Sequence, residues 1–486
     1  MNKYGFGLAA GCLLAAALAG CDAGGGTGGN AVSWSDAGDE AAPGANAGGS
    51  AGGDTGDNAA EAGGPSSGTG KTMIVFSTFW HDPKYQAAKK AYEALHPDVE
   101  IKLEDVDYTN ETLETDIEKY VTAANAALLS GKGPDLIDMD LVPADSYVKH
   151  GLLADLSPMM AQDKAFKRSD YFTNVLDNVR VGDALYAMPL SFFLMGLAGD
   201  EGAIAKTGVA FDDLSWSWSD FTQTAEAMTA SGGLRTALSY EGPEYLLGEM
   251  VSDNYGLFLD AGGREAHFDS ASFTGLMKQV KTMFDDGVVS KAGRGVNAYF
   301  NSIQINSPKD YLESMAGFSL SAKMTDQTAG DHVKLYAKPH AQDTAAGGYF
   351  KTYRSVAIAA NSKVKAAAWD FVKFLMSEEM QAPATTTGFP INKTAYAKQV
   401  EALKKQGSFP SFAEGPLQGA AIQADGAMLD GLDAYVNGAI HPSQDNKSDQ
   451  IWNLVVAESK AFFAGQKSAE AVASLIQNKA TTFLNE

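Results

Sequence analysis

Cysteine is scarce in this chain. Two cysteines, Cys12 and Cys21, occur in 486 residues. This excludes a framework of several disulfides, of the kind that holds small secreted scaffolds together. The chain is long enough for roughly two or three domains, and 45% of its residues are hydrophobic. We therefore expect its folded part to be stabilised by a hydrophobic core.

Basic residues are also few. The chain has 37 lysines and arginines against 60 aspartates and glutamates, which gives a net charge of −23. Binding to nucleic acid needs a basic surface, so the composition argues against a nucleic-acid partner. It argues equally against broad electrostatic docking on anionic lipid.

Motifs for catalysis are missing as well. The sequence contains no Gly-x-Ser-x-Gly, no phosphate-binding loop, no His-Glu-x-x-His and no cysteine pair for a metal. The seven histidines show no ligand spacing. A calcium loop is possible among so many acids, although Asp253-Asn254 alone is not one. Asp138 and Asp140 remain possible as a glycosidase pair, because sequence does not reveal the distance between them. The sequence favours a protein that is not an enzyme and needs no cofactor or metal.

The N-terminus has a pattern of its own. Lys3 precedes an apolar run from Phe6 to Ala19, which is too short for a transmembrane helix and is typical of a secretory signal. The run ends in Leu18-Ala19-Gly20-Cys21, the pattern of a bacterial lipobox. We predict that residues 1–20 are a lipoprotein signal peptide and that acylated Cys21 holds the protein in the bilayer, extracytoplasmically. A simple signal peptide with an incidental cysteine is the alternative.

Residues 21–70 differ sharply from the rest in composition. After Cys21 they are mainly glycine, alanine, serine, asparagine and acid, with no basic residue, and Val32 and Trp34 are the only large apolar side chains. Such a segment cannot fill a core, so we predict a disordered tether.

The folded region begins with an alternation of strands and helices. Apolar spacing predicts strands at 72–77, 99–103 and 134–139 and helices at 83–95 and 113–129. This order predicts a parallel sheet with helices on its faces. Ligands of such sheets bind at the carboxyl ends of the strands. Residues 79–82 and 138–140 are therefore expected beside one crevice.

Five segments resemble motifs of a known family, in the family's order. They are Ser130-Gly-Lys-Gly-Pro-Asp-Leu-Ile-Asp-Met-Asp, Gly151-Leu-Leu-Ala-Asp-Leu-Ser, Leu185-Tyr-Ala-Met-Pro, the 362–381 segment with Ala-Trp-Asp-Phe-Val-Lys-Phe-Leu-Met-Ser-Glu-Glu, and Gly388-Phe-Pro-Ile-Asn. The chain is similar to the extracellular solute-binding proteins of ABC importers, which include maltose- and maltodextrin-binding proteins. It departs from the family at Ala198-Gly199-Asp200 and at Ser215 to Ser219.

The resemblance implies an α/β, two-lobed, periplasmic-binding-protein-like fold of type II. Each lobe would hold a mainly parallel sheet flanked by helices, and a hinge would join the lobes. The first lobe would take residues 71–188 and 356–395, and the second 189–355 and 396–486. Segments 353–359 and 186–190 would cross between them. The implied partner is the membrane permease of the importer, and we expect a monomer.

A sugar site combines aromatic rings with acids and amides that serve hydroxyl groups. Strand-end position selects Trp80, Asp138 and Asp140, although Trp80 can instead pack at the hinge and the two acids can instead cap or turn the chain. The resemblance adds three more candidates. Tyr245 matches a region where sugar-binding relatives carry an acid and a tyrosine, and Phe318 matches a region where they present a stacking aromatic. Tyr349 follows Gly347-Gly348, a turn that faces the cleft in relatives. Trp216 and Trp218 are expected to pack at the start of a helix.

The sequence therefore predicts a receptor that binds a sugar or oligosaccharide between two lobes and delivers it to an ABC importer. Two alternatives stay open. One is a surface enzyme acting on polysaccharide, and the other is a sensor or adhesin with the same fold.

Overall fold

The computed structural model describes residues 70–231, 235–259, 265–291, 297–325, 332–341, 344–383, 387–411, 413, 417–443 and 447–485. The predicted signal peptide, Cys21 and the tether up to residue 69 lie outside the described residues. Among the described helices, none combines the length and the apolar character needed to cross a bilayer.

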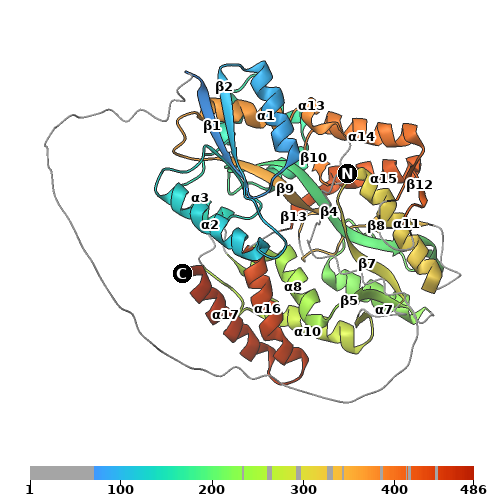
Figure 1. Ribbon diagram of the computed structural model, residues 1–486. Helices are drawn as coiled ribbons and strands as arrows, with labels where there is room; N and C mark the ends of the chain where they lie inside the picture. Colours follow the sequence, from blue (N-terminus) through green and yellow to red (C-terminus); the bar gives the residue numbers. More distant parts are fainter. Residues whose placement is uncertain are drawn as a thin grey trace, which may run out of the picture. The chain divides into compact units, whose positions relative to one another are not determined.

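The first part of the sheet follows the predicted alternation. Strands β1 (Thr72–Ser77), β2 (Val99–Glu104) and β3 (Leu136–Asp138) are parallel, with β1 in the middle. Helix α1 (Pro83–Leu95) begins where the side chain of Asp82 accepts the backbone N–H of Lys84, with proline in the first turn. Helix α2 (Leu113–Leu129) has the predicted bounds. Figure 1 shows α1 beside these strands.

The other strands extend this sheet on one side. They are β4 (Met188–Asp200), β5 (Thr236–Tyr240), β6 (Val289–Lys291), β7 (Ala298–Ile305), β8 (Val333–Tyr336), β9 (Gly348–Ile358), β10 (Phe389–Pro390) and β13 (Ala439–Pro442). The order is β2-β1-β3-β9-β4-β7-β5-β6, and β8 and β10 pair with β4 while β13 pairs with β9. Strands β11 (Ser408–Pro410) and β12 (Ala421–Gln423) form a separate antiparallel pair.

Two long strands connect the two halves of this sheet. Strand β9 pairs antiparallel with β3 through Val356 to Ile358 and with β4 through the rest of its length. Strand β4 in turn pairs antiparallel with β7. The two segments predicted to cross between lobes, 186–190 and 353–359, overlap with the start of β4 and the end of β9. The lobe boundaries themselves stay predictions.

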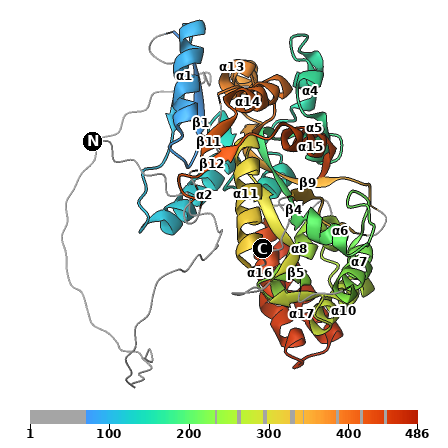
Figure 2. The same ribbon diagram turned by 90° about the vertical axis from the view of Figure 1, so that its right-hand side faces the viewer.

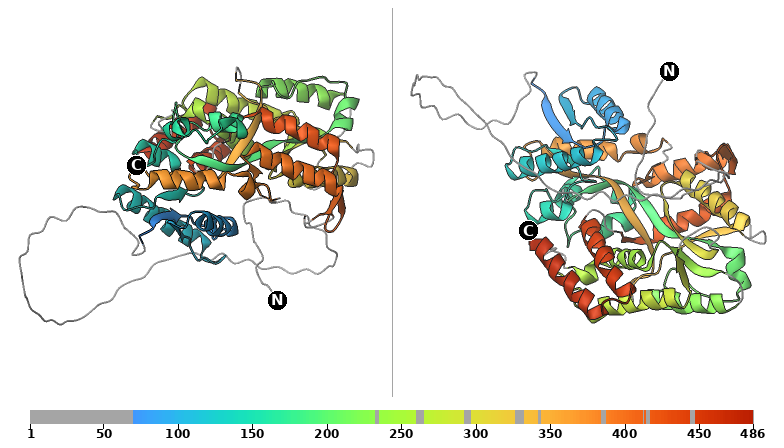
Figure 3. Two further views of the ribbon diagram at one scale, coloured as in Figure 1. Left: turned by 90° about the horizontal axis from the view of Figure 1, so that it is seen from above. Right: turned by 60° about the horizontal axis from the view of Figure 1, so that its bottom comes forward.

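Helices pack around the sheet (Figures 1 and 2). The remaining helices are α3 (Ala144–Lys149), α4 (Ser157–Gln162), the 3-10 turn η1 (Arg168–Asp170), α5 (Thr173–Asn178), α6 (Glu201–Lys206), α7 (Trp218–Ala230), α8 (Pro243–Asp253), α9 (Tyr255–Phe258), α10 (Ala271–Asp285), α11 (Pro308–Thr325), α12 (Lys365–Leu375), α13 (Glu378–Gln381), α14 (Lys393–Gln406), α15 (Gly426–Gly438), α16 (Lys447–Phe463) and α17 (Ala469–Asn485). The C-terminal helices α16 and α17 lie side by side, as Figure 3 shows, and α16 packs on α8.

Within the described residues, the buried apolar side chains form three clusters. One contains Phe76, Phe192 and Trp369, a second surrounds Phe221 and Phe300, and the third lies around Phe79. Trp216 and Trp218 belong to the second cluster and are 3% and 4% exposed. Trp218 is the first residue of α7, which Ser217 caps. The prediction that these two indoles pack at a helix start is confirmed.

Candidate solute-binding site

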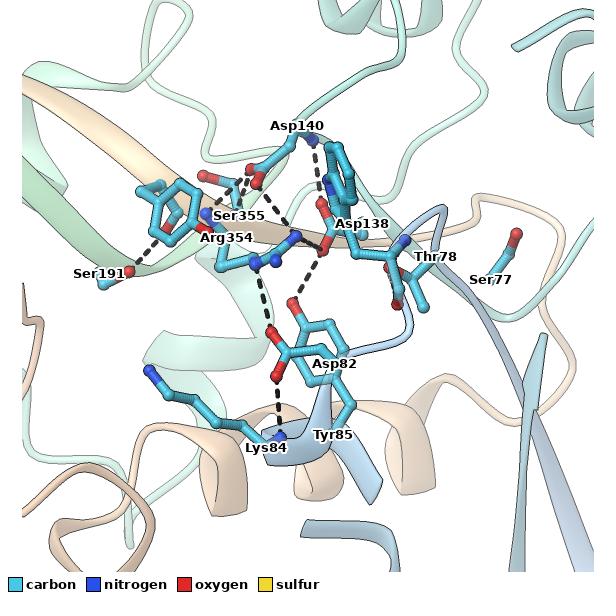
Figure 4. Close-up of polar contacts among 12 residues, drawn as sticks. Ser77, Thr78, Asp82, Lys84, Tyr85, Asp138, Asp140, Ser191, Arg354 and Ser355 are labelled. Carbon is cyan, nitrogen blue, oxygen red and sulfur yellow. Dashed lines mark hydrogen bonds and ion pairs between the residues drawn. The ribbon is translucent and has the colours of Figure 1, made fainter. Parts of the chain in front are cut away.

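Three carboxylates surround one guanidinium where β1 and β3 end. Asp82 precedes α1, Asp138 is the last residue of β3, and Asp140 follows it. Figure 4 shows all three side chains directed at the guanidinium of Arg354, which belongs to β9. The two segments that strand order placed beside one crevice therefore lie together.

The ion pairs of Arg354 are longer than hydrogen bonds. Its Nε lies 3.3 Å from Oδ2 of Asp82, and its Nη1 lies 3.7 Å from Oδ2 of Asp138 and 3.6 Å from Oδ2 of Asp140. The side chain of Arg354 is 16% exposed and that of Asp138 only 3%. The group is thus held by charge in a largely buried setting, where electrostatic attraction is stronger than in water.

Backbone groups fix Asp140 between two strands. Its Oδ1 accepts the N–H of Arg354 at 2.9 Å and that of Ser355 at 3.4 Å, while its own N–H donates to Oδ1 of Asp138 at 3.0 Å. The hydroxyl of Tyr85 donates to the other oxygen of Asp138. The carboxylates are therefore oriented by α1, β3 and β9 together.

Burial sets the proton affinities in this group. It raises the pKa of Asp138, and the positive charge of Arg354 opposes that rise. Burial also raises the pKa of Asp140 well above its usual value, and the negative charge of Asp138 adds to the rise. Burial alone would lower the pKa of Arg354, but the neighbouring carboxylates, Asp138 foremost, outweigh it and raise that pKa. Arg354 stays charged while negative charge is in excess around it.

An aromatic surface adjoins the ionic group. The ring of Trp80 packs edge-on against Phe79 at 4.9 Å and against Tyr108 at 5.6 Å. The guanidinium of Arg354 lies 5.9 Å from the centre of the Trp80 ring. Trp80 is half-buried and Tyr108 is 39% exposed. An apolar face and a set of hydrogen-bonding groups therefore meet at one place.

A pocket opens on Arg354. Its lining includes Asp82, Lys84, Ser191, Arg354 and Gly388. Gly388 has φ +86, and a Cβ there would meet the hydroxyl of Ser191 at 2.6 Å. The Gly-x-Pro turn of the family resemblance thus approaches β4 closely because it has no side chain. The pocket thus borders Arg354 and Asp82.

The other three aromatic candidates lie in different surroundings. Tyr245 is half-buried in α8, with its ring 5.8 Å from that of Trp452. Phe318 is half-buried in α11, against the first core cluster. Tyr349 is 1% exposed in β9. All six candidate residues stay predictions as ligand contacts.

A second buried ionic group lies beside Tyr349. Lys338 is 1% exposed, and its Nζ lies 2.5 Å from Oε1 of Glu249 and 2.5 Å from Oδ2 of Asp253, both on α8. Burial raises the pKa of Asp253 to about 6 even though Lys338 opposes the rise. Two carboxylates share one cation here, and the arrangement ties α8 to the segment after β8.

Sequence reasoning missed Arg354 and Lys338. Arg354 is the lone charged residue in the otherwise uncharged run Thr352 to Ala360, and a charge within a predicted buried strand indicates a buried partner. Lys338 has no comparable mark, because it lies in an ordinary loop sequence.

Comparison with known proteins agrees with the architecture. The chain is similar to an extracellular solute-binding protein family 1 member from Alicyclobacillus acidocaldarius, at 18% identity and a TM-score of 0.56, over 86% of this chain and 99% of that one. The sugar-binding protein MalE of Xanthomonas citri gives 15% identity and a TM-score of 0.57, over 85% and 98%. The cyclic alpha-maltosyl-1,6-maltose binding protein of Arthrobacter globiformis gives 15% and 0.54, over 85% and 99%.

These similarities confirm the predicted two-lobed α/β fold of solute-binding proteins. The family itself is shown by sequence, because residues 80–382 match bacterial extracellular solute-binding proteins. That family consists of binding proteins that work outside the cytoplasm. This chain belongs to the bacterial extracellular solute-binding proteins.

Proposed function

We propose that this protein binds a sugar or oligosaccharide between two lobes and delivers it to the permease of an ABC importer. The observation that carries the proposal is the meeting of the Trp80 ring with Asp138, Asp140 and Arg354. Sugars have an apolar CH face and a rim of hydroxyls, so a ring beside carboxylates and a guanidinium matches both parts.

Two relatives favour a carbohydrate over other solutes. The Xanthomonas citri protein is named as sugar-binding, and the Arthrobacter globiformis protein is named for a cyclic maltosyl-maltose. Both are similar to this chain in fold and distant in sequence, so they support the class of ligand and leave the individual sugar open.

The binding mode that we propose uses both lobes. Trp80, Asp138 and Asp140 would contact the sugar from the first lobe, residues 71–188 and 356–395. Phe318, Tyr245 and Tyr349 are the candidates from the second lobe, residues 189–355 and 396–486. Strands β4 and β9 would serve as the hinge. A ligand that contacts both lobes favours the closed form, because only that form makes both sets of contacts.

The proposal includes a lipid anchor on a single polypeptide acting as a monomer. Acylated Cys21 would hold it at the extracytoplasmic face of the membrane, with residues 22–70 as the tether. Cys21→Ala should move the protein from the membrane fraction to the exported soluble fraction. Mass spectrometry that finds a mature N-terminus elsewhere, without lipid, would contradict the anchor and leave sugar binding untouched.

The function is tested by calorimetric titration of the purified chain against a panel of neutral sugars and oligosaccharides. The recovered sugar is then analysed by chromatography. Binding with intact sugar supports a receptor. Shortened or rearranged products indicate an enzyme acting on polysaccharide. If the purified protein binds the sugar but a strain that lacks the protein still takes up that sugar at an undiminished rate, the protein is a sensor or adhesin.

A further inference from the structure

Arg354 has hydrogen-bond donors that the described part of the protein does not use. Nε and Nη1 of Arg354 are buried and make no hydrogen bond in the structure. Each faces a carboxylate at 3.3 to 3.7 Å, close enough for charge attraction but poorly arranged for donation. Two buried donors of Arg354 therefore lie beside carboxylates without a hydrogen bond, and buried donors of this kind need a partner.

The backbone of Arg354 adopts an unfavourable conformation. Arg354 has φ 56, and among the described residues it alone has a positive φ without being glycine. It lies in β9 between Ser355, which pairs with Pro189, and Tyr353, which pairs with Ser191. The guanidinium lies 5.0 Å from the ring of Tyr353. Strained residues of this kind persist where the surroundings hold them for a function, often at ligand sites.

The charge of the group limits which solutes it accepts. Three carboxyl groups, those of Asp82, Asp138 and Asp140, face one guanidinium, and among the described residues that line the pocket Lys84 is the further cation. An anionic solute would bring a further negative charge beside these three carboxyl groups in a poorly solvated place. A hydroxyl both donates and accepts, so it satisfies a carboxylate and a guanidinium at once without adding charge.

We propose that Arg354 contacts the ligand and determines specificity, binding the hydroxyls of an uncharged sugar jointly with Asp82 and Asp140, while the three carboxyl groups around it exclude sugar acids. This inference rests on the proposed function and extends it from a ligand class to the charge of the ligand. Arg354 supplies donors to the sugar. It also offsets part of the negative charge of the carboxyl groups beside it.

The test compares the full chain with Arg354→Gly and Arg354→Lys. Glycine removes the guanidinium while accepting the positive φ, so the strand should keep its conformation. Lysine keeps the charge but loses the planar set of donors. Arg168→Ala is the matched control, because Arg168 pairs with Asp177 through side chains that are 41% and 47% exposed. The probes are maltotriose, the glucosamine trisaccharide and the galacturonate trisaccharide, together with the neutral sugar that binds best in the panel.

The wild type should bind its best neutral sugar at least about tenfold more tightly than the galacturonate trisaccharide. Arg354→Gly should weaken neutral binding by about tenfold to a hundredfold, as expected for hydrogen bonds involving a charged group. It should also shift the preference toward the glucosamine trisaccharide by about tenfold, because the remaining carboxylates lose their counter-charge. Arg354→Lys should weaken neutral binding without that shift. Arg168→Ala should bind like the wild type.

Two results would overturn the inference while leaving the proposed function standing. One is neutral sugar binding that Arg354→Gly leaves unchanged. The other is a wild type that takes the acidic trisaccharide as well as the neutral sugar. A lower melting temperature of Arg354→Gly with unchanged affinity would make the residue purely structural. If the wild type binds no sugar of the panel at all, the proposed function fails, and this inference fails with it.

Discussion

The hydroxyl of Tyr85 donates a 2.9 Å hydrogen bond to Oδ2 of Asp138, the same oxygen that lies 3.7 Å from Nη1 of Arg354. A helix residue thus stabilises the most buried carboxylate of the site. Tyr85→Phe should lower the free energy of unfolding by about 1–3 kcal/mol, because a buried charged group loses a hydrogen bond. Denaturant unfolding measures this loss.

Tyr92→Phe is the matched control. Its hydroxyl donates to Asp370 at 2.8 Å, but the side chain of that carboxylate is 42% exposed and water can replace the lost donor. Equal losses in the two variants would show that burial of Asp138 does not matter.

The positive φ of Arg354 leads to a prediction about the stability of variants at this position. At φ 56, alanine clashes with the following carbonyl and glycine does not. Arg354→Gly should therefore be more stable than Arg354→Ala by about 1 kcal/mol, although both lack the side chain. Equilibrium unfolding of the two variants gives the difference. An alanine variant as stable as the glycine variant would contradict the positive φ.

The raised pKa of Asp253 should make the stability of the folded chain depend on pH. Burial raises its pKa to about 6 in the folded chain, above the value of about 3.9 expected when unfolded. The folded state then binds the proton more tightly, so this group's stabilising effect is complete below pH ~4 and is lost as pH rises to ~6. The loss should amount to about 2–3 kcal/mol.

Asp253→Asn should remove that slope. The comparison uses denaturant unfolding of wild type and variant at a series of pH values, and the difference between the two curves isolates this group from other carboxylates. A difference that does not change between pH ~4 and ~6, or that changes in the opposite sense, would refute the raised pKa.

Trp80 and Phe79 are neighbours in sequence with opposite expected effects. Phe79 is 1% exposed, so Phe79→Ala should destabilise the fold by about 3–5 kcal/mol. Trp80 is half-buried beside Arg354. Trp80→Ala should lower sugar affinity by about tenfold to more than a hundredfold, the loss of an apolar platform worth about 1–3 kcal/mol, with a smaller loss of stability.

Thermal melts and calorimetric titration of the same two variants separate these effects. If Trp80→Ala unfolds the protein and spares the affinity of the folded fraction, the indole is a packing residue. The remaining aromatic candidates for sugar contact would then be Tyr245, Phe318 and Tyr349.

Local patterns predicted the beginning of the fold well. The helices at Pro83–Leu95 and Leu113–Leu129 match their predicted bounds. An N-terminal Asp-Pro and clear apolar spacing define the first helix. A glycine two residues past the end of the second helix helps to define where it stops. Strand β9 begins at Gly348, earlier than the predicted start at Tyr353. The pair Gly347-Gly348 indicates a turn in the sequence, but in the structure Gly348 is already the first residue of the strand.

The site was predictable only in part. Asp138 and Asp140 follow from their strand-end position, a local pattern that topology then brings beside Asp82. Arg354 pairs with residues more than two hundred positions earlier in the chain, and its left-handed backbone has no sequence mark. Contacts of that kind depend on the register between β3 and β9, which only the folded sheet defines.

A structure of the chain with its best-binding neutral sugar tests the central claim most directly. We expect the sugar ring to lie against the indole of Trp80, with a hydroxyl within hydrogen-bonding distance of Arg354 and of Asp140 or Asp82. A sugar bound elsewhere, for example between Tyr245 and Trp452 and without contact to Trp80 or Arg354, would contradict the site.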